Sequence, residues 1–285
     1  MKSRLYSACI WVLGALFGMG GAYGQNPYYP TASYLWQETT YDTAFMQVLY
    51  KMEFWDQWHS ERYEDVRMLE IGMNYRKDYS LRLDILDRKT KECTERFETP
   101  MFRLDSAVYP FEWFVEKNNS WSTFRTIYGG PVLRWPEKTP DFTWQLLDEA
   151  DTVAGFLCQK AKTFHGGRIY EAYYCPDIPV SAGPYRFGGL PGLILKIQDT
   201  ASLYKWEITG MQHGKYPIAE KQFLFQKSNK KKATEVISFM FAHPFKFLVE
   251  VLHMDLMIQD GKGGAYSPGE REFGISWFYE PIEIE

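Results

Sequence analysis

The stretch FLCQKAKTFHGGRIYEAYYC, Phe156–Cys175, defines the fold better than any other part of the sequence. Its two halves flank Gly166-Gly167, and a glycine pair supplies the positive φ values that a two-residue primed turn requires. With this turn, residues whose numbers sum to 333 face each other. One register then produces apolar, opposite-charge and small pairs, as favourable cross-strand pairing requires. The stretch therefore predicts an antiparallel hairpin, and the pairs are Phe164 with Ile169, Lys162 with Glu171 and Ala161 with Ala172.

Further strand-like segments surround the hairpin. Ser80–Leu86 alternates apolar and polar residues and predicts a strand with one solvent-exposed face. The charged segment Lys89–Arg96 predicts a helix or a long turn. A helical pattern follows at residues 233–257, where Pro244 must kink or split the helix. The other predicted strands are 44–54, 66–75, 141–147, 192–198 and 203–211.

Successive hairpins without alternating helices argue against a doubly wound parallel sheet. We expect an α+β fold, dominated by a large curved antiparallel sheet, with one or two helices near residues 233–257. A half-open barrel, similar by analogy to LolA-type carriers, is the specific expectation.

The N-terminal residues have the pattern of a secretory signal peptide. Lys2 and Arg4 precede the uncharged apolar run Leu5–Gly20, and Ala22-Tyr23-Gly24 places small residues before a cleavage site. A permanent membrane anchor is the alternative, but the run is short for a span of about 20 residues. We expect residues 1–24 to be removed and residues 25–285 to form a single β-rich domain with no further transmembrane span.

Export would allow the cysteines to form disulfides, because disulfides persist in oxidising compartments. The hairpin register places Cys158 opposite Cys175 as a non-hydrogen-bonded pair, about 4.5 Å apart at Cα. This separation is at the low end of disulfide geometry. We predict a Cys158–Cys175 disulfide, which leaves Cys93 unpaired. Two buried free thiols, or a register shifted by a bulge, are the alternatives.

Composition excludes one class of function. The formal net charge is -4, and loss of Lys2 and Arg4 would make it -6, whereas nucleic-acid binders carry a basic patch. The lysine cluster at residues 227 and 230–232 is explained by a solvated loop or a helix start. The terminal Glu280, Glu283 and Glu285 are interpreted as a solvated or strand-edge feature.

Aromatic residues make up 18% of the chain. They suit a packed β core, and they also line pockets for apolar ligands. Four tryptophans are candidate wall residues for such a pocket, although each also fits the core: Trp113, Trp121, Trp135 and Trp144.

Motifs for chemistry are missing from the sequence. It contains no H-E-x-x-H, C-x-x-C or G-x-S-x-G, so it indicates no metal, no cofactor and no catalytic residue.

GGLPGLI, Gly188–Ile194, is the most distinctive short motif. Pro191 fixes φ and Gly192 permits a positive φ, which is typical of a type II turn before a core strand. Glycine also lets backbone approach a ligand closely, so a structural turn and a binding loop are both open interpretations.

The surrounding segment IPVSAGPYRFGGLPGLILKIQD, Ile178–Asp199, resembles the signature of the GLPGLI family of exported Bacteroidetes proteins. Phe142–Tyr174 resembles the family's upstream stretch, and the final EPIEIE resembles its closing NPIELE, with Glu280 where Asn is usual. The resemblance implies the periplasm or the outer-membrane periphery, and no catalytic residue carries over. The motif residues are Gly183, Pro184, Gly188, Gly189, Leu190, Pro191, Gly192, Leu193 and Ile194.

This origin suggests O-glycosylation. In such bacteria, exported proteins can carry a glycan on the Ser or Thr of an Asp-Ser/Thr pair that precedes a small or apolar residue. Ordinary turn chemistry is the alternative explanation of these triplets. The candidate acceptors are Thr43, Ser106, Thr152 and Thr200.

Three functions are compared. The favoured one is a non-catalytic periplasmic binding or carrier protein for an apolar ligand, either lipid, lipoprotein or peptide. The alternative is a structural or assembly partner of an outer-membrane complex, and an enzyme is the least favoured. An apolar cavity of several hundred Å³ would indicate the first. A filled sheet interior with an exposed apolar patch would indicate the assembly partner. Titratable groups clustered in a cleft would indicate the enzyme.

Overall fold

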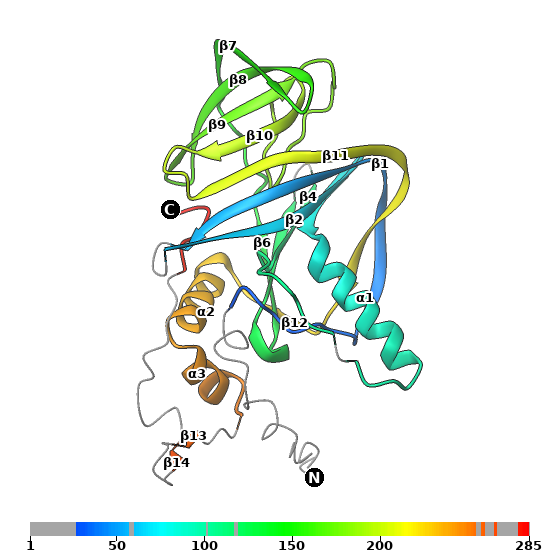
Figure 1. Ribbon diagram of the computed structural model, residues 1–285, viewed down its shortest axis with the longest axis vertical. Helices are drawn as coiled ribbons and strands as arrows, with labels where there is room; N and C mark the ends of the chain where they lie inside the picture. Colours follow the sequence, from blue (N-terminus) through cyan, green and yellow to red (C-terminus); the bar gives the residue numbers. More distant parts are fainter. Residues whose placement is uncertain are drawn as a thin grey trace.

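The computed structural model describes residues 27–56, 60–100, 102–116, 119–254, 258–259, 265–266 and 279–284. Within these ranges, twelve strands form one large, open and curved sheet with helices packed against it (Figure 1). The predicted β-dominated fold with a large curved antiparallel sheet is confirmed. The expected signal peptide lies outside the described residues.

The strands of the large sheet run through most of the described chain. They are β1 (Gln37–Asp56), β2 (Glu61–Gly72), β3 (Tyr75–Ser80), β4 (Phe111–Glu116), β5 (Ser120–Arg125), β6 (Val132–Glu137), β7 (Gln145–Val153), β8 (Phe156–His165), β9 (Arg168–Cys175), β10 (Leu193–Asp199), β11 (Tyr204–Gln222) and β12 (Phe225–Lys227). β13 (Ile258–Gln259) and β14 (Ala265–Tyr266) pair separately.

The helical elements are fewer. They are α1 (Leu81–Glu95), the 3₁₀ turn η3 (Ile127–Gly129), α2 (Lys230–Ala242), α3 (Pro244–Lys246) and the π-helical turn η4 (Phe247–Val251). Within the described ranges, none of the helices combines the length and the apolar character that crossing a membrane requires.

Two long strands, β1 and β11, form the middle of the sheet. The order is β12-β6-β5-β4-β3-β2-β1-β11-β10-β9-β8-β7. All neighbours are antiparallel except β12 and β6. Two meanders, β1–β6 and β7–β11, therefore meet where β1 pairs with β11.

The sheet curls so strongly that its β6 edge returns towards the end of β11. β12 pairs with β6, yet only residues 223 and 224 separate it from β11. Contacts cross the curl: Lys77 Nζ donates to the Ala219 carbonyl at 2.8 Å, and Trp121 Nε1 donates to Glu220 Oε1 at 2.7 Å. The curl creates a concave face, which the main hydrophobic core fills.

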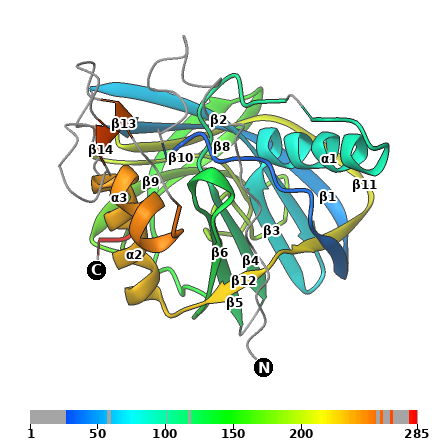
Figure 2. The same ribbon diagram turned by 90° about the horizontal axis from the view of Figure 1, so that it is seen from below.

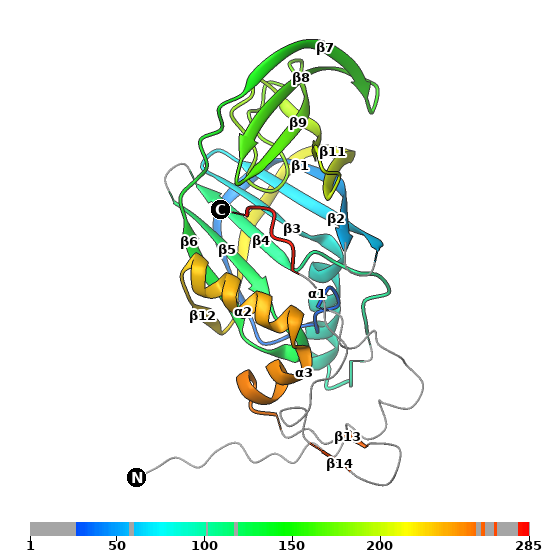
Figure 3. The ribbon, with the colours of Figure 1, turned by 90° about the vertical axis from the view of Figure 1, so that its left-hand side faces the viewer.

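Helix α2 covers part of this concave face (Figure 3). Asn229 caps it by accepting from Lys232 N at 2.9 Å, and its buried residues are Ala233, Ile237, Met240 and Phe241. The predicted interruption at Pro244 is confirmed, because α2 ends at Ala242 and a new turn begins at Pro244. Residues 255–257 of the predicted helix lie outside the described ranges.

Helix α1 corrects the strand predicted at Ser80–Leu86. The Ser80 hydroxyl accepts from Leu83 N at 3.3 Å and starts a helix there. The buried positions 83, 84, 86, 87 and 90 follow the helical spacing. Three of these five residues are polar or acidic, so the sequence does not show a helical period of apolar residues. The buried Asp87 pairs with Arg125 and with Lys221, each at 3.0 Å. Figure 2 shows α1 and α2 on opposite flanks of the sheet.

The predicted hairpin is confirmed as β8 and β9. Its register pairs Phe164 with Ile169, Lys162 with Glu171 and Ala161 with Ala172, around a turn in which Gly166 and Gly167 have φ of 55° and 77°.

The predicted Cys158–Cys175 disulfide is wrong for this structure, which holds both residues as fully buried free thiols. The β8–β9 pairing ends at Gln159 and Tyr174, and beyond it Cys158 pairs with Asp151 of β7 while Cys175 pairs with Leu193 of β10. Burial, and then the neighbouring Cys175, raise the pKa of the Cys158 thiol to about 11, so it stays neutral. Cys93 is also free.

The GLPGLI motif joins this hairpin to β10. Leu190, Leu193 and Ile194 are buried in the main core. The expected positive φ lies at Gly189, at 87°, and not at Gly192. Gly192 is required for another reason, since a Cβ there would lie 2.2 Å from the Cys175 carbonyl oxygen.

This close approach leads to a stability prediction. Gly192→Ala should lower the free energy of unfolding by about 3 kcal/mol, because backbone rather than a flexible side chain must move. Gly210→Ala on β11 is the matched control, since its Cβ would meet only Leu49 Cδ1, at 3.9 Å. It should be neutral or stabilising by up to about 1 kcal/mol. Urea unfolding of both variants measures the difference, and equal midpoints would refute the steric argument.

Candidate functional site

The concave face holds the segment Tyr279–Ile284, called here the tail segment, between β9 and α2 (red in Figure 3). Side chains of the sheet bind its main chain. Arg168 donates to the carbonyls of Pro281 and Ile282 at 3.0 and 3.1 Å, and the Tyr170 hydroxyl donates to the Ile282 carbonyl at 3.0 Å. The Tyr204 hydroxyl donates to the Glu280 carbonyl, and Ile284 N donates to the Gly166 carbonyl at 2.9 Å.

Glu283 is the most strongly bound side chain of the tail segment. Its carboxylate contacts the His165 ring at 3.1 Å and accepts from Tyr185, Arg186 and Lys230. Burial alone would raise the pKa of Glu283, but the contacts with His165, Arg186, Lys230 and Tyr185 outweigh burial and hold this pKa far below its usual value. Glu283 is therefore ionised at neutral pH.

Glu280 forms a second ionic contact, with Arg168. Arg168 is only 7% exposed, and it also lies 3.7 Å from Asp199. We call the residues that bind the tail segment the tail site: His165, Gly166, Arg168, Tyr170, Tyr185, Arg186, Tyr204 and Lys230.

Apolar packing completes the docking. Ile282 is 5% exposed within the main core, between two acidic residues of the tail. The Tyr279 ring stacks on Phe111 at 6.2 Å and contacts Phe241 of α2 at 5.2 Å between centroids. Along the tail segment, residues that form ion pairs thus alternate with residues that pack against the hydrophobic core.

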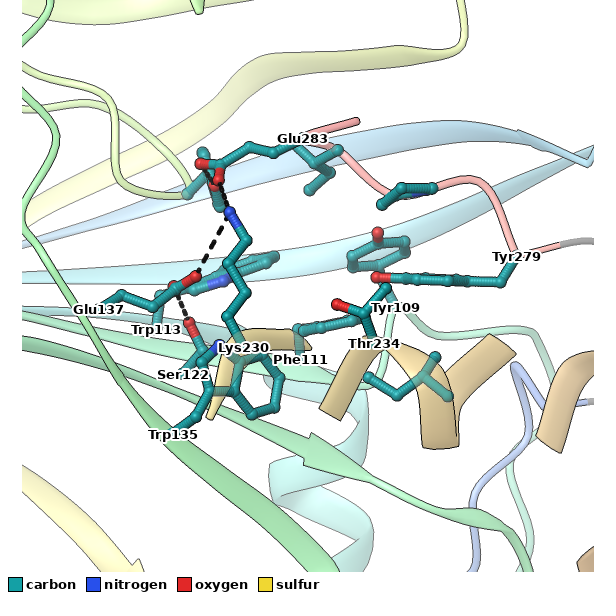
Figure 4. A pocket seen from close by; sticks show the side chains of 14 residues that line it. Tyr109, Phe111, Trp113, Ser122, Trp135, Glu137, Lys230, Thr234, Tyr279 and Glu283 are labelled. Carbon is teal, nitrogen blue, oxygen red and sulfur yellow. Dashed lines mark hydrogen bonds and ion pairs between the residues drawn. The ribbon is translucent and has the colours of Figure 1, made fainter. Parts of the chain in front are cut away.

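A small cavity of about 40 Å³ lies beside the tail segment (Figure 4). Aromatic residues of β4 and β6 line it together with α2, and Lys230 reaches across towards Glu137 and Glu283. Trp113 and Trp135 are among these lining residues, and Trp135 Nε1 has no hydrogen-bond partner among the described residues. Binding pockets for small molecules measure about 300–1,000 Å³, so this cavity suits one side-chain group at most.

The other two candidate tryptophans lie elsewhere. Trp121 belongs to the smaller core around Ala44, Phe114 and Ile218. Trp144 donates to the Gly188 carbonyl at 2.8 Å and so supports the GLPGLI loop.

The loop before the motif positions Tyr185 and Arg186. Tyr185 N donates to the buried Asp78 at 2.8 Å, and the residue has a φ of 57°, which is unusual for a non-glycine. Arg76 donates to the Phe187 carbonyl at 2.8 Å. Gly183 packs against Ile194, where a Cβ would lie 3.0 Å from Ile194 Cβ. The motif thus forms the support behind the tail site, and Pro184 and Pro191 belong to the same loop.

No local sequence pattern brings together the residues that form this site. Glu280 and Glu283 are bound in ion pairs, which corrects their interpretation as a solvated or strand-edge feature. Lys230 does begin a helix, but its ammonium group also binds Glu283. The terminal EPIEIE carried the only signal, as a pattern of alternating acidic and apolar residues.

The glycosylation candidates differ in accessibility. Thr43, Thr152 and Thr200 are exposed, whereas Ser106 is half-buried and accepts from Arg82 at 2.7 Å. Asp42 and Asp151 accept from the backbone N–H of Thr43 and Thr152, as turn chemistry requires. Glycosylation itself stays a prediction.

Comparison with known proteins adds one family match. The model described as "Protein of unknown function (Porph_ging)" matches residues 165–196. The matched residues run from the β8–β9 turn into β10, so they include the GLPGLI motif and part of the tail site. No curated protein matches the chain.

Two solved structures match part of the chain. "Structure of PNGF-II in P21 space group" is 14% identical and "Structure of PNGF-II in C2 space group" is 13% identical, each with a TM-score of 0.43. Both matches cover 68% of this chain, but 33% and 32% of the PNGF-II chains. The chain therefore spans about a third of the length of these structures.

The lowered pKa of Glu283 predicts how its contribution to stability depends on pH. A carboxyl group with a depressed folded pKa stabilises the fold above its unfolded value and loses this effect as pH falls through the folded pKa. The unfolded value is about 4.3. The free energy of unfolding of wild type should exceed that of Glu283→Gln by about 2–3 kcal/mol above pH 5, and this difference should narrow below about pH 4.

Urea unfolding between pH 3 and pH 7 measures this gap. The buried Asp65 and Asp78, whose pKa values burial raises, act in the opposite direction but are common to both proteins and cancel. Glu235→Gln on the exposed face of α2 is the control and should show no gap. A gap that is constant with pH would contradict the ionic role of Glu283.

Proposed function

We propose that the chain is an exported, non-catalytic binding protein of the cell envelope, and that the tail site is its binding surface for an extended peptide. The single observation that carries this proposal is the docking of the tail segment. Three side chains of the sheet, Arg168, Tyr170 and Tyr204, bind carbonyl groups of its backbone. Main-chain recognition of this kind binds peptides regardless of their sequence, and pockets then add specificity.

Export supports the envelope location. The charged, apolar and small-residue pattern of residues 1–24 is that of a secretory leader. The resemblance to exported GLPGLI proteins agrees with it, and we place the protein in the periplasm or at the periphery of the outer membrane.

Among the apolar ligands considered, a peptide fits better than a lipid or an acyl chain. The main core, including Phe111 and Trp113, fills the concave face, and the cavity there measures about 40 Å³. An acyl chain needs a longer apolar cavity. The tail site instead offers donors at the spacing of peptide carbonyls.

An enzyme is less well supported. Titratable groups do converge beside the cavity, but the carboxylates of Glu137 and Glu283 both contact Arg186, at 3.1 Å for Glu137. The low pKa of Glu283 prevents it from donating a proton at neutral pH. This cluster suits the binding of charge.

One observation favours the alternative role in an outer-membrane assembly. β7 is an edge strand whose residues are mostly exposed, and Leu146 and Leu157 near this edge are 56% and 66% exposed. An exposed edge can pair with a strand of another protein. However, Asp148, Glu149 and Asp151 lie on β7, and a bulge interrupts its pairing between Leu146 and Ala150; both features protect edges from pairing.

Peptide binding can be tested with the full-length chain carrying Glu280→Gln and Glu283→Gln, which weakens docking of its own tail. A fluorescein-labelled peptide YEPIEI should bind this variant with a Kd in the micromolar range, measured by fluorescence anisotropy. Wild type should bind the peptide at least about tenfold more weakly, because a tethered segment competes at an effective concentration in the millimolar range.

A fluorescent fatty acid is the second probe in the same experiment. Saturable binding of the fatty acid, with no binding of the peptide to either protein, would replace the proposed function with a lipid carrier. Circular dichroism confirms beforehand that the double variant is folded.

A further inference from the structure

We infer that the tail site selects extended segments of other proteins with the pattern acidic–X–branched apolar–acidic, the pattern that Glu280-Pro281-Ile282-Glu283 presents within the chain itself. This inference rests on the proposed function and specifies its ligand. The ligand is a peptide of stated chemistry, and the tail segment occupies its place in the same molecule.

The first argument is the separation of two carboxylate subsites. Arg168 on β9 binds the carboxylate of Glu280. The second subsite combines Arg186 of the motif loop with Lys230 of α2, and both bind Glu283. Because these cations come from separate elements of a packed fold, they fix the distance between the two acidic residues of a ligand.

The second argument concerns the residue between the two acids. Ile282 is buried in the main core, whereas Ile284, beyond the second acid, is 54% exposed. An apolar side chain is therefore required at the position before the second acid and not after it. Arg168 and Tyr170 both bind the carbonyl of this same residue, which fixes its orientation.

The third argument is charge balance. Arg186 and Arg168 are only 3% and 7% exposed. Within the site they face Glu137 and Asp199, and Lys230 adds a third positive charge. Glu137 and Asp199 balance the two buried arginines, so the excess positive charge of the site is that of Lys230, whose side chain is 43% exposed, and an acidic occupant neutralises it. The site thus favours an acidic ligand even though the whole chain carries a net charge of -4.

The test compares peptides on the Glu280→Gln/Glu283→Gln protein. YEPIEI should bind about tenfold more tightly than YQPIEI or YEPIQI, since each loses one charged contact. The permuted peptide YPEIEI has the same composition and charge but the wrong spacing, and it should bind as weakly as the single-glutamine peptides.

A second substitution in the same protein assigns the subsites. Lys230→Gln should weaken YEPIEI about three- to tenfold and leave YEPIQI unchanged, because Lys230 contacts the second and not the first of the two acidic residues of the ligand. Lys232→Gln is the matched control; it is exposed, two residues along α2, and should change neither affinity.

The outcomes separate the two levels of the proposal. Equal binding of YEPIEI and YPEIEI, or equal loss of YEPIEI and YEPIQI on Lys230→Gln, would overturn the selectivity and leave peptide binding intact. Absence of binding by every peptide would overturn the proposed function together with this inference.

Discussion

The carboxylate of Asp78 connects β3 to the loop that carries Tyr185 and Arg186 of the tail site. It is fully buried on β3, where it accepts from Arg67 Nε and Nη2 at 2.8 and 2.5 Å and from Tyr185 N at 2.8 Å. Arg67, in turn, donates to the carbonyls of Tyr109 and Phe111, each at 2.8 Å. Burial raises the pKa of Asp78, and Arg67 opposes this rise. A buried ion pair is tolerated only when its remaining donors are satisfied, and here they are.

The placement of the loop residues of the tail site follows from this pair. Because Asp78 holds the Tyr185 backbone, the Tyr185 side chain is directed to Glu283 despite the unusual φ of the residue. Arg186 follows directly and bridges Glu283 to Glu137 on β6. Lys230 then connects the same carboxylate to α2. One carboxylate of the tail therefore holds together a loop, a strand and a helix that are distant in sequence.

The sequence predicted the features that depend on neighbouring residues. The β8–β9 register followed from the Gly166-Gly167 turn, and the break after Ala242 followed from the backbone chemistry of Pro244. The features it missed depend on partners far along the chain. Asp87 is tolerated on the buried face of α1 because Arg125 and Lys221 meet it there, and no local pattern reveals them.

The same reasoning explains two further differences. Gly192 was assigned a positive φ from its turn sequence, whereas its real constraint is the Cys175 carbonyl, which only the folded chain brings near. Glu283 resembled a solvated terminal residue because its partners lie 53 to 118 positions away in sequence. Long-range electrostatics, more than hydrophobic patterning, therefore separates what this sequence reveals from what the structure shows.

A segment docked within its own chain also sets a condition on any external ligand. The tail segment competes at the high local concentration that covalent attachment gives, so an external peptide with the same contacts would be at a disadvantage. A better ligand must make contacts that the tail does not make. The cavity of about 40 Å³ beside Ile282 provides room for such a contact, an apolar side chain that reaches further than that of isoleucine. An external ligand must therefore bind the tail site more tightly than the chain's own tail does, and the cavity is the place where it can form the additional contact.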